Sequence, residues 1–317
     1  MSSVVRRKQP QIGVEPKPGR LSTLFKEIAA SKTYYLFLAP YAILFIIFTV
    51  VPVVMAVLLS FTYFNMLQPP QWVGMHNYVR LFLEDEIFLL AVKNTLVYAS
   101  ITGPVSYILC FVTAWLINEL KPKVRAFLTL LFYAPSISGN AYVIWQVIFS
   151  GDSYGIINGF LMYWGFIDSP VQWLFDPDLI MPIVILVVLW MSLGTGFLVF
   201  VAGLQGLDQS LYEAGAIDGV RNRWQELWYL TLPQMRPYLM FGAIITITSS
   251  FTVAGEISTL VGFPSTDYAA HTIVQHLQDY GTIRFDMGYA SAIAVILFFM
   301  MVVSQRVVQK LLNKVGE

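Results

Sequence analysis

Cysteine and charged residues are both scarce in this sequence. Cys110 is the single cysteine among 317 residues, which excludes an intrachain disulfide and a cysteine metal cluster. Because it lies within a long apolar stretch, we interpret it as a small packing residue. Charged residues make up only 12% of the chain, about half the usual share in soluble domains, whereas 57% are hydrophobic. This composition excludes an ordinary soluble domain and indicates a protein of the lipid bilayer.

Sequence signatures of catalysis and of nucleotide binding are also missing. The chain has no Gly-Lys-Ser or Gly-Lys-Thr of the P-loop type, no dinucleotide fingerprint, no nucleophile elbow and no zinc-binding His-Glu helix. His271 and His276 are five residues apart, so one helical face would not carry both, and we interpret them as surface histidines rather than metal ligands. We therefore expect no catalytic residue, no metal site and no cofactor bound by this chain itself.

Six apolar stretches are each long enough to cross the hydrocarbon core of a bilayer as a helix, which takes about 20 residues. They lack the strict alternation of a membrane β-barrel. The sequence therefore predicts an all-α integral membrane protein with six transmembrane helices, over residues 36–64, 88–117, 127–149, 180–204, 238–260 and 287–308. We expect a tail at 1–35, one transmembrane domain at 36–312 and a short tail at 313–317. The first span is too long for the apolar core of a signal peptide.

Basic residues are distributed unevenly along the chain, although the net charge is zero. If the N-terminal tail is cytoplasmic, all of the 19 basic residues except Arg80, Lys93 and Arg284 fall on the cytoplasmic side. This is the distribution that the positive-inside rule describes. The even number of spans then places both termini, and the polar loop at 205–236, in the cytoplasm.

The polar loop at 205–236 contains two helix-start patterns. Ser210 precedes Glu213 by three residues, and Asn222 precedes Gln225 by three, as in a capping box. We predict two short helices hinged near Gly219. In the first of them, a run of small side chains leaves a shallow surface that the backbone of another protein could approach; the run is Ala214, Gly215 and Ala216. The alternative is an ordinary capped amphipathic helix without a partner.

This loop resembles the coupling loop of permease subunits in binding-protein-dependent ABC importers, in the carbohydrate-uptake, MalF-like branch. The residues that carry the resemblance are Glu213, Ala214, Gly215, Asp218, Gly219, Leu232 and Pro233, with weaker matches from about residue 36 to residue 312. The resemblance implies the type I ABC importer permease fold, with these seven residues docking ATPase subunits.

The same resemblance implies a set of partners in the cell membrane of a prokaryote. They are a second homologous permease subunit, two ATP-binding subunits that hold ATP and Mg, an extracytoplasmic solute-binding protein and the lipid bilayer. Nucleic acid is not an expected partner. Two departures from the family pattern concern the loop: Gly215 stands where the family has a second Ala, and the stretch from Gly219 to Leu232 is one residue longer. The longer stretch leaves the orientation of the second helix open.

Polar residues within the apolar spans are the candidates for a translocation path, because they are costly in lipid and face an interior or a cavity. In the fifth span, Ser249, Thr252 and Glu256 follow helical spacings of three and four, so we expect them on one face. The resemblance places Ser249 and Thr252 near sugar-contact positions, with Gly194 and Phe197 in the fourth span. The alternative is that such small polar residues serve close helix packing.

Two other functional classes stay open on the sequence alone. A stand-alone secondary transporter driven by an ion gradient usually needs an intramembrane carboxylate and often shows internal repeats, whereas here Glu256 is the single well-placed carboxylate and no repeat is visible. A membrane-embedded enzyme is the remaining class. The sequence favours an ATP-driven sugar or oligosaccharide importer over both.

Overall fold

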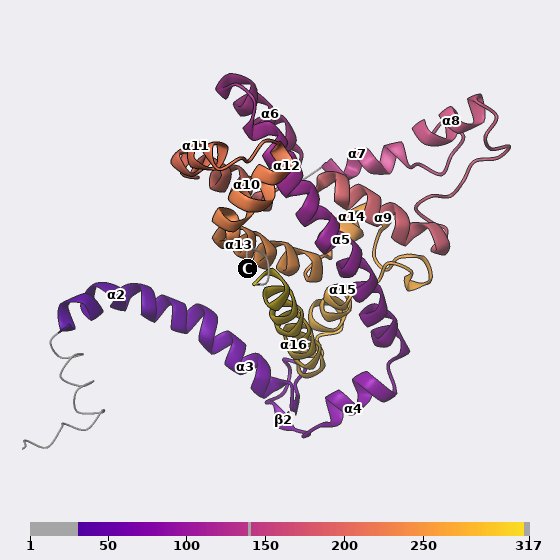
Figure 1. Ribbon diagram of the computed structural model, residues 1–317. Helices are drawn as coiled ribbons and strands as arrows, with labels where there is room; N and C mark the ends of the chain where they lie inside the picture. The colour runs from indigo at the N-terminus through magenta and orange to yellow at the C-terminus, as the bar shows by residue number, and fades with distance from the viewer. Residues whose placement is uncertain (1–30, 139–140, 314–317) are drawn as a thin grey trace, which may run out of the picture. The chain divides into compact units, whose positions relative to one another are not determined.

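The computed structural model describes residues 31–138 and 141–313, and most of them are helical (Figure 1). The chain divides into two units, residues 1–55 and 56–317, and each is described by itself. The tails expected at 1–35 and 313–317 lie mainly outside the described residues.

The first unit contains the start of one long apolar helix. α2 (Lys32–Phe45) passes through a π-helical turn (Ile46–Val50) into α3, which begins at Val51 and ends at Leu59 within the second unit. Pro52 follows the π-helical turn; proline lacks an N–H and crowds the carbonyl four residues earlier, and a wider turn relieves that crowding. In the part of the chain that the structure describes, no side chain of its most apolar stretch is buried, as suits a helix surrounded by hydrocarbon.

The second unit begins with a small hairpin. β1 (Thr62–Tyr63) pairs antiparallel with β2 (Gln71–Trp72), and α4 (His76–Leu83) follows. The buried Asn77 side chain donates hydrogen bonds of 2.9 Å to the carbonyls of Ser60 and Thr62, which holds α4 against the start of the hairpin. Gly288 packs so closely on the same strand that a Cβ there would lie 2.0 Å from the Thr62 carbonyl oxygen. Any larger residue would displace the hairpin.

Long apolar helices make up the rest of the second unit. Three further stretches are long and apolar enough to span a bilayer: α5 (Glu86–Asn118), α9 (Pro177–Met191) continued by α10 (Thr195–Gln205), and α16 (Met287–Leu312). Two bent pairs each qualify when taken together: α6 (Pro122–Ile137) with α7 (Ala141–Ile148), and the helix ending at Phe251 with α14 (Gly255–Val261). With the first helix, the described residues supply four spans, or six when each bent pair is one span, at the predicted positions.

Shorter elements connect these spans. They are α8 (Ile156–Tyr163), α11 (Gln209–Ile217), α12 (Arg223–Glu226), a π-helical turn (Leu227–Thr231), α13 (Leu232–Phe251), a 3-10 turn (Thr266–Tyr268), α15 (Ile273–Gln278) and a second π-helical turn of this unit (Asp279–Ile283).

Three buried clusters lie along α5, which runs through the middle of the second unit (Figure 1). Near its N-terminal end, Phe88 packs with Ile273 of α15 and Tyr289 of α16. Tyr98 packs with α7, α9 and α14. Near its C-terminal end, Ala114 packs with α10 and α13. Each cluster buries apolar side chains from several spans, so α5 holds the helices of this unit together.

Candidate functional site

The first short helix of the loop at 205–236 starts two residues earlier than the capping pattern predicts. Asp208 is the N-cap of α11, and its carboxylate accepts a hydrogen bond of 2.9 Å from the Ser210 amide. Ser210 is therefore inside the helix, and the predicted cap at Ser210 with Glu213 is wrong. Asp208 is the preferred N-cap because a carboxylate also interacts favourably with the positive end of the helix dipole. Glu213 is released from a capping role, and its side chain is exposed.

The end of α11 depends on the backbone of Gly219. Gly219 has a φ of +96°, and the Val220 amide donates to the Gly215 carbonyl at 2.9 Å, closing a Schellman motif. Nothing lies within 4 Å of a Cβ added at Gly219, so glycine is required by the left-handed conformation rather than by space. The predicted hinge at Gly219 is confirmed.

One face of α11 is exposed. Ile217 follows Glu213 by four residues and Ala214 by three, and all three are exposed, as is Asp218 at the helix end. Ile217 is 87% exposed. Ile217 is not among the docking residues predicted from the sequence, although an apolar residue at this spacing in a polar loop is a usable signal for a docking surface.

Gly215 does not belong to this exposed face. It is buried, and a Cβ there would lie 2.7 Å from Cδ1 of Leu230 in the π-helical turn. The expectation that Gly215 opens a shallow surface for a partner is corrected: its small size lets α11 pack on the rest of its own loop. An alanine here would require the end of the Leu230 side chain to shift.

The second short helix begins where predicted. Asn222 caps α12 through a hydrogen bond of 2.8 Å from the Gln225 amide, and Gln225 Oε1 accepts from the Arg221 amide at 3.0 Å. The chain then passes through the π-helical turn into α13, whose first two residues, Leu232 and Pro233, are half-buried. Leu232 packs on the cluster at the C-terminal end of α5, so this end of the loop is anchored to the spans.

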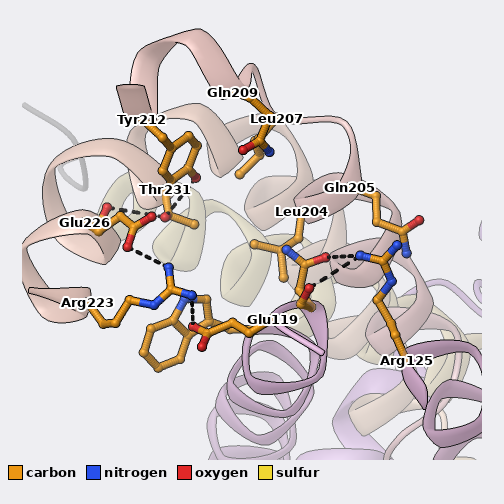
Figure 2. A pocket seen from close by; sticks show the side chains of 12 residues that line it. Glu119, Arg125, Leu204, Gln205, Leu207, Gln209, Tyr212, Arg223, Glu226 and Thr231 are labelled. Carbon is orange, nitrogen blue, oxygen red and sulfur yellow. Dashed lines mark hydrogen bonds and ion pairs between the residues drawn. The ribbon is translucent and has the colours of Figure 1, made fainter. Parts of the chain in front are cut away.

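A polar cavity of about 350 Å³ lies between this loop and the C-terminal end of α5 (Figure 2). On one side, Tyr212 of α11 and Thr231 share a hydrogen bond of 3.0 Å between their hydroxyls. Next to this pair, the Thr231 hydroxyl donates to the Glu226 carbonyl at 3.3 Å, and Arg223 contacts Glu226 at 2.7 Å and Glu119 at 2.9 Å. Arg223 of α12 thus connects the loop to the end of α5 along the edge of the cavity.

The predicted path residues of the fifth span do not share one continuous helix. Ser249 lies on α13 and Thr252 is its C-cap, whereas Glu256 lies in the first turn of α14, beyond a bend of 46°. The expectation of one face for all three is corrected. Thr272 stabilises the break, because its hydroxyl donates to the freed carbonyl of Val253 at 3.0 Å.

Ser249 and Thr252 are nevertheless exposed, and each hydroxyl group donates a hydrogen bond to a backbone carbonyl. The Ser249 hydroxyl donates to the Thr246 carbonyl at 2.9 Å, and the Thr252 hydroxyl donates to the Thr248 carbonyl at 2.9 Å. Each hydroxyl proton is therefore in use, and each oxygen presents acceptor lone pairs. Such oxygens suit a ligand that donates hydrogen bonds.

Gly194 and Phe197 lie in different environments. Gly194 is the N-cap of α10 at the break in the fourth span, where a Cβ would sit 3.5 Å from Cβ of Ser136 in α6. The Phe197 side chain is fully buried in the cluster at the C-terminal end of α5. In this structure Phe197 contacts core residues rather than an open path.

The two histidines of the loop at 262–286 are buried, so their interpretation as surface residues is wrong. His271 Nε2 lies 3.2 Å from Nδ1 of His276, and His276 Nε2 lies 3.0 Å from Asp85. The Asp85 carboxylate also accepts from the Tyr289 hydroxyl at 2.7 Å and from the Phe88 amide at 2.8 Å. The sequence does not reveal these partners, because Asp85 is 191 residues from His276.

These contacts set the protonation of the cluster. Burial raises the pKa of Asp85, but the hydrogen bonds from His276, Tyr289 and the Phe88 amide outweigh burial and hold that pKa well below its usual range. Burial, together with the neighbouring His276, lowers the pKa of His271 to about 4. His276, which contacts the Asp85 carboxylate, therefore lies beside His271, which stays neutral at pH 7.

Other polar residues of α5 fix the same loop. Asn94 donates hydrogen bonds of 3.1 Å to the carbonyls of Tyr268 and His271, and Thr95 accepts from the Ile273 amide at 3.0 Å. The loop at 262–286 is thus an ordered segment bound to the N-terminal half of α5.

Comparison with known proteins agrees with this architecture. The family model of the binding-protein-dependent transport system inner membrane component matches residues 28–316. The probable ABC transporter permease protein YesP of Bacillus subtilis is 32% identical over 266 residues, covering 82% of this chain and 84% of YesP. The lactose transport system permease protein LacF of Rhizobium radiobacter is 28% identical over 285 residues, covering 86% and 93%.

A solved structure shows the same fold. In the crystal structure of a bacterial ABC transporter involved in the import of the polysaccharide alginate, one chain superposes with a TM-score of 0.72 at 26% identity, covering 93% of this chain and all of that one. A second crystal structure holds the alginate transporter in complex with a periplasmic protein that binds an alginate pentasaccharide; its chain gives a TM-score of 0.74 at 25% identity. This chain therefore belongs to the family of inner membrane components of binding-protein-dependent transport systems, and it is a multi-pass ABC transporter permease.

Proposed function

We propose that this chain is one permease subunit of an ATP-driven importer for a sugar or oligosaccharide. The observation that carries the proposal is the exposed face of α11 with Glu213, Ala214 and Ile217, on a loop that is anchored to the spans at Leu232. Two ATPase subunits would dock on such faces, one on this chain and one on a second homologous permease subunit. ATP and Mg are bound by those subunits and not by this chain. Both termini and the loop at 205–236 lie in the cytoplasm.

Several relatives support the carbohydrate class. LacF is named for lactose, two AraP proteins are named for arabinooligosaccharides, and the solved neighbours transport alginate. The exposed acceptor oxygens of Ser249 and Thr252 fit a hydroxyl-rich solute, because sugar hydroxyls are donors. An extracytoplasmic binding protein would deliver that solute. The ordered loop at 262–286 is the segment of this chain that we assign to its docking.

The proposed mechanism is a shift between two orientations of the helix bundle. ATP binding draws the two ATPase subunits together, and their differential contacts with α11 favour the orientation that is open to the outside. Hydrolysis then resets the bundle. An ion-gradient-driven transporter is the weaker candidate, because the chain belongs to a family of binding-protein-dependent transport components.

Purification through a tag on this chain tests the proposal directly. We expect ATPase subunits to co-purify with the wild-type chain, and Glu213→Ala to reduce their recovery and their stimulated hydrolysis at least severalfold. Because Glu213 has no capping role, this variant leaves α11 itself intact. Lys123→Ala, at an exposed position of α6 outside the loop, is the matched control and keeps normal association. Normal ATPase recovery in Glu213→Ala would contradict docking on this face.

The substrate class is tested with defined sugars. Proteoliposomes containing the complete complex are assayed with radiolabelled lactose, an arabino-oligosaccharide and an alginate oligosaccharide as probes. We expect at least one to be taken up, and Ser249→Leu to lower its uptake while ATPase association is unchanged. Uptake kinetics that do not change in Ser249→Leu or Thr252→Val would favour a packing role for these side chains.

A further inference from the structure

Arg223 joins the second short helix of the loop at 205–236 to the end of α5. Its guanidinium contacts Glu119 Oε1 at 2.9 Å and Glu226 Oε2 at 2.7 Å (Figure 2). Glu119 is the C-cap of α5, and Glu226 is the last residue of α12. A planar guanidinium presents its donors in fixed directions, so a bridge between two carboxylates orients α12 relative to α5 more closely than an ammonium group could.

An aromatic contact lies next to this bridge. The rings of Trp115 on α5 and Trp224 on α12 have centroids 5.7 Å apart. The polar cavity of about 350 Å³ adjoins this contact and is lined by Tyr212 on the side of α11. The Arg223 bridge and the tryptophan contact therefore connect α12 directly to α5 at the edge of the cavity, beside the packed cluster that holds Leu227 and Leu232.

α5 reaches from this bridge to the opposite side of the second unit. It has 33 residues, which corresponds to about 50 Å of helix. Its C-terminal end carries Glu119, and its N-cap is Asp85, which is held by His276 and Tyr289. A displacement at Glu119 is therefore transmitted along one helix to the segment that anchors the loop at 262–286.

We propose that Arg223 is a positioning residue that transmits displacement of the coupling loop to α5, and through α5 to the buried cluster around Asp85. This inference rests on the proposed function, because the displacement comes from the docked ATPase subunits. Arg223 and Glu119 have side chains 55% and 35% exposed, so their ion pair contributes little to folding stability. We expect loss of this ion pair to reduce the transmission of loop displacement to α5 instead.

The experiment measures transmission at the far end of α5. The complex is purified through a tag on this chain, Cys110 is replaced by Ala, and a reporter cysteine replaces the exposed Glu84 just before α5. The rate of maleimide labelling is measured with and without MgATP and vanadate. In Arg223→Gln we expect ATPase association and hydrolysis to be retained, while the ATP-dependent change in labelling rate falls by about three- to fivefold.

Partner variants and a neighbouring arginine provide the controls. Glu119→Gln should give the same loss, and the double variant with Arg223→Gln should lose no more than either single variant, because all three remove one connection. Arg221→Gln is the matched control: its side chain is exposed, and its backbone amide, which the substitution keeps, makes the contact to Gln225. It should respond to MgATP as the wild type does.

The outcomes separate this inference from the proposed function. A full labelling response in Arg223→Gln, an equal loss in Arg221→Gln, or additive losses in the double variant would each overturn the role of Arg223 alone. A wild-type complex that retains no ATPase subunit would overturn the proposed function, and the inference with it. Loss of ATPase association in Arg223→Gln would also overturn it, because Arg223 would then act in docking rather than in transmission.

Discussion

The two ends of α5 are held by polar contacts of opposite character. At the N-terminal end, the side chains of Asp85 and His276 are 9% and 3% exposed, and the carboxylate accepts three hydrogen bonds. At the C-terminal end, Glu119 and Arg223 are largely in contact with solvent beside an open cavity. A buried, fully hydrogen-bonded charge is costly to disturb, whereas an exposed pair exchanges readily with water. One end is therefore held rigidly to its neighbours and moves together with them, whereas the contact at the other end can rearrange.

The residues around the two ends of α5 differ in the same way, packed at one end and exposed at the other. Arg80 pairs with Asp286 at 3.1 Å and lies 4.1 Å from the ring centre of Tyr289, so the N-terminal end is covered by further packed groups. Near the C-terminal end, α11 exposes Glu213 and Ile217 to solvent. Under the proposed function, the residues for docking and movement lie where the chain leaves its own contacts incomplete.

The largest expected effect is the loss of the buried carboxylate. Asp85→Ala leaves the donors of His276, Tyr289 and the Phe88 amide without their acceptor, and we expect a loss of about 3 to 5 kcal/mol in the free energy of unfolding. Thermal unfolding of the purified chain in detergent measures it. Glu119→Ala is the matched control at the other end and should cost less than about 1 kcal/mol. Equal losses in the two variants would remove the contrast between the two ends.

Acid should weaken the same buried cluster. The pKa of His271 is about 4 in the folded chain, below its ordinary value of about 6.5, so the unfolded chain binds more protons between these values. Stability is therefore fully present above pH 6.5 and falls as the pH is lowered to 4, by about 3 kcal/mol. The groups facing His271 are His276, Asp85 and Asp279. The depressed pKa of Asp85 adds a loss in the same direction at still lower pH.

Unfolding at several pH values checks this prediction. His271→Asn removes the titrating ring, so its stability should depend less on pH between 4 and 6.5 than that of the wild type. Substituting His76, an exposed residue at the start of α4, should leave the pH dependence unchanged. A wild-type stability that is flat across this window would contradict a neutral, buried His271.

Much of the fold could be predicted from the sequence because its signals are local. Span positions follow from apolar length, the cap at Asn222 from a side chain three residues before the amide that donates to it, and the turn at Gly219 from glycine's access to positive φ. The cap and the turn depend on residues within about one turn, and each span depends on its own continuous stretch. The structure confirms all three.

The features that the sequence did not reveal depend on distant contacts. Nothing near His271 indicates that Asp85 and His276 form a buried cluster with it, and nothing near Gly215 indicates that Leu230 packs against it. The break after Thr252 is likewise stabilised by Thr272, twenty residues further along the chain. Tertiary contacts of this kind override local patterns of helical spacing.

A smaller effect is expected at the turn that ends α11. Gly219→Val forces a β-branched residue into a left-handed conformation, and we expect a cost of about 1 to 2 kcal/mol, local to the loop. ATPase recovery should fall with it, because the exposed face of α11 is then misplaced. Gly219→Asn is the matched control, since asparagine tolerates this conformation, and it should retain most of the association. Equal recovery in the two variants would show that the turn geometry does not matter for docking.

The smallest effect concerns the cap of α11 and decides between two adjacent residues. Asp208→Ala removes the carboxylate that accepts from the Ser210 amide, so we expect α11 to lose about 1 kcal/mol of local stability. Ser210→Ala should change it by only a few tenths of a kcal/mol, because the Ser210 side chain lies within the helix rather than at its cap.

Hydrogen exchange of the amides in residues 209–217 resolves these local changes, which are too small to shift global unfolding. Asn222→Ala should speed exchange in α12 and leave α11 unaffected. Faster exchange in Ser210→Ala than in Asp208→Ala would restore Ser210 as the cap, and with it a structural role for Glu213 that would complicate any docking defect in Glu213→Ala.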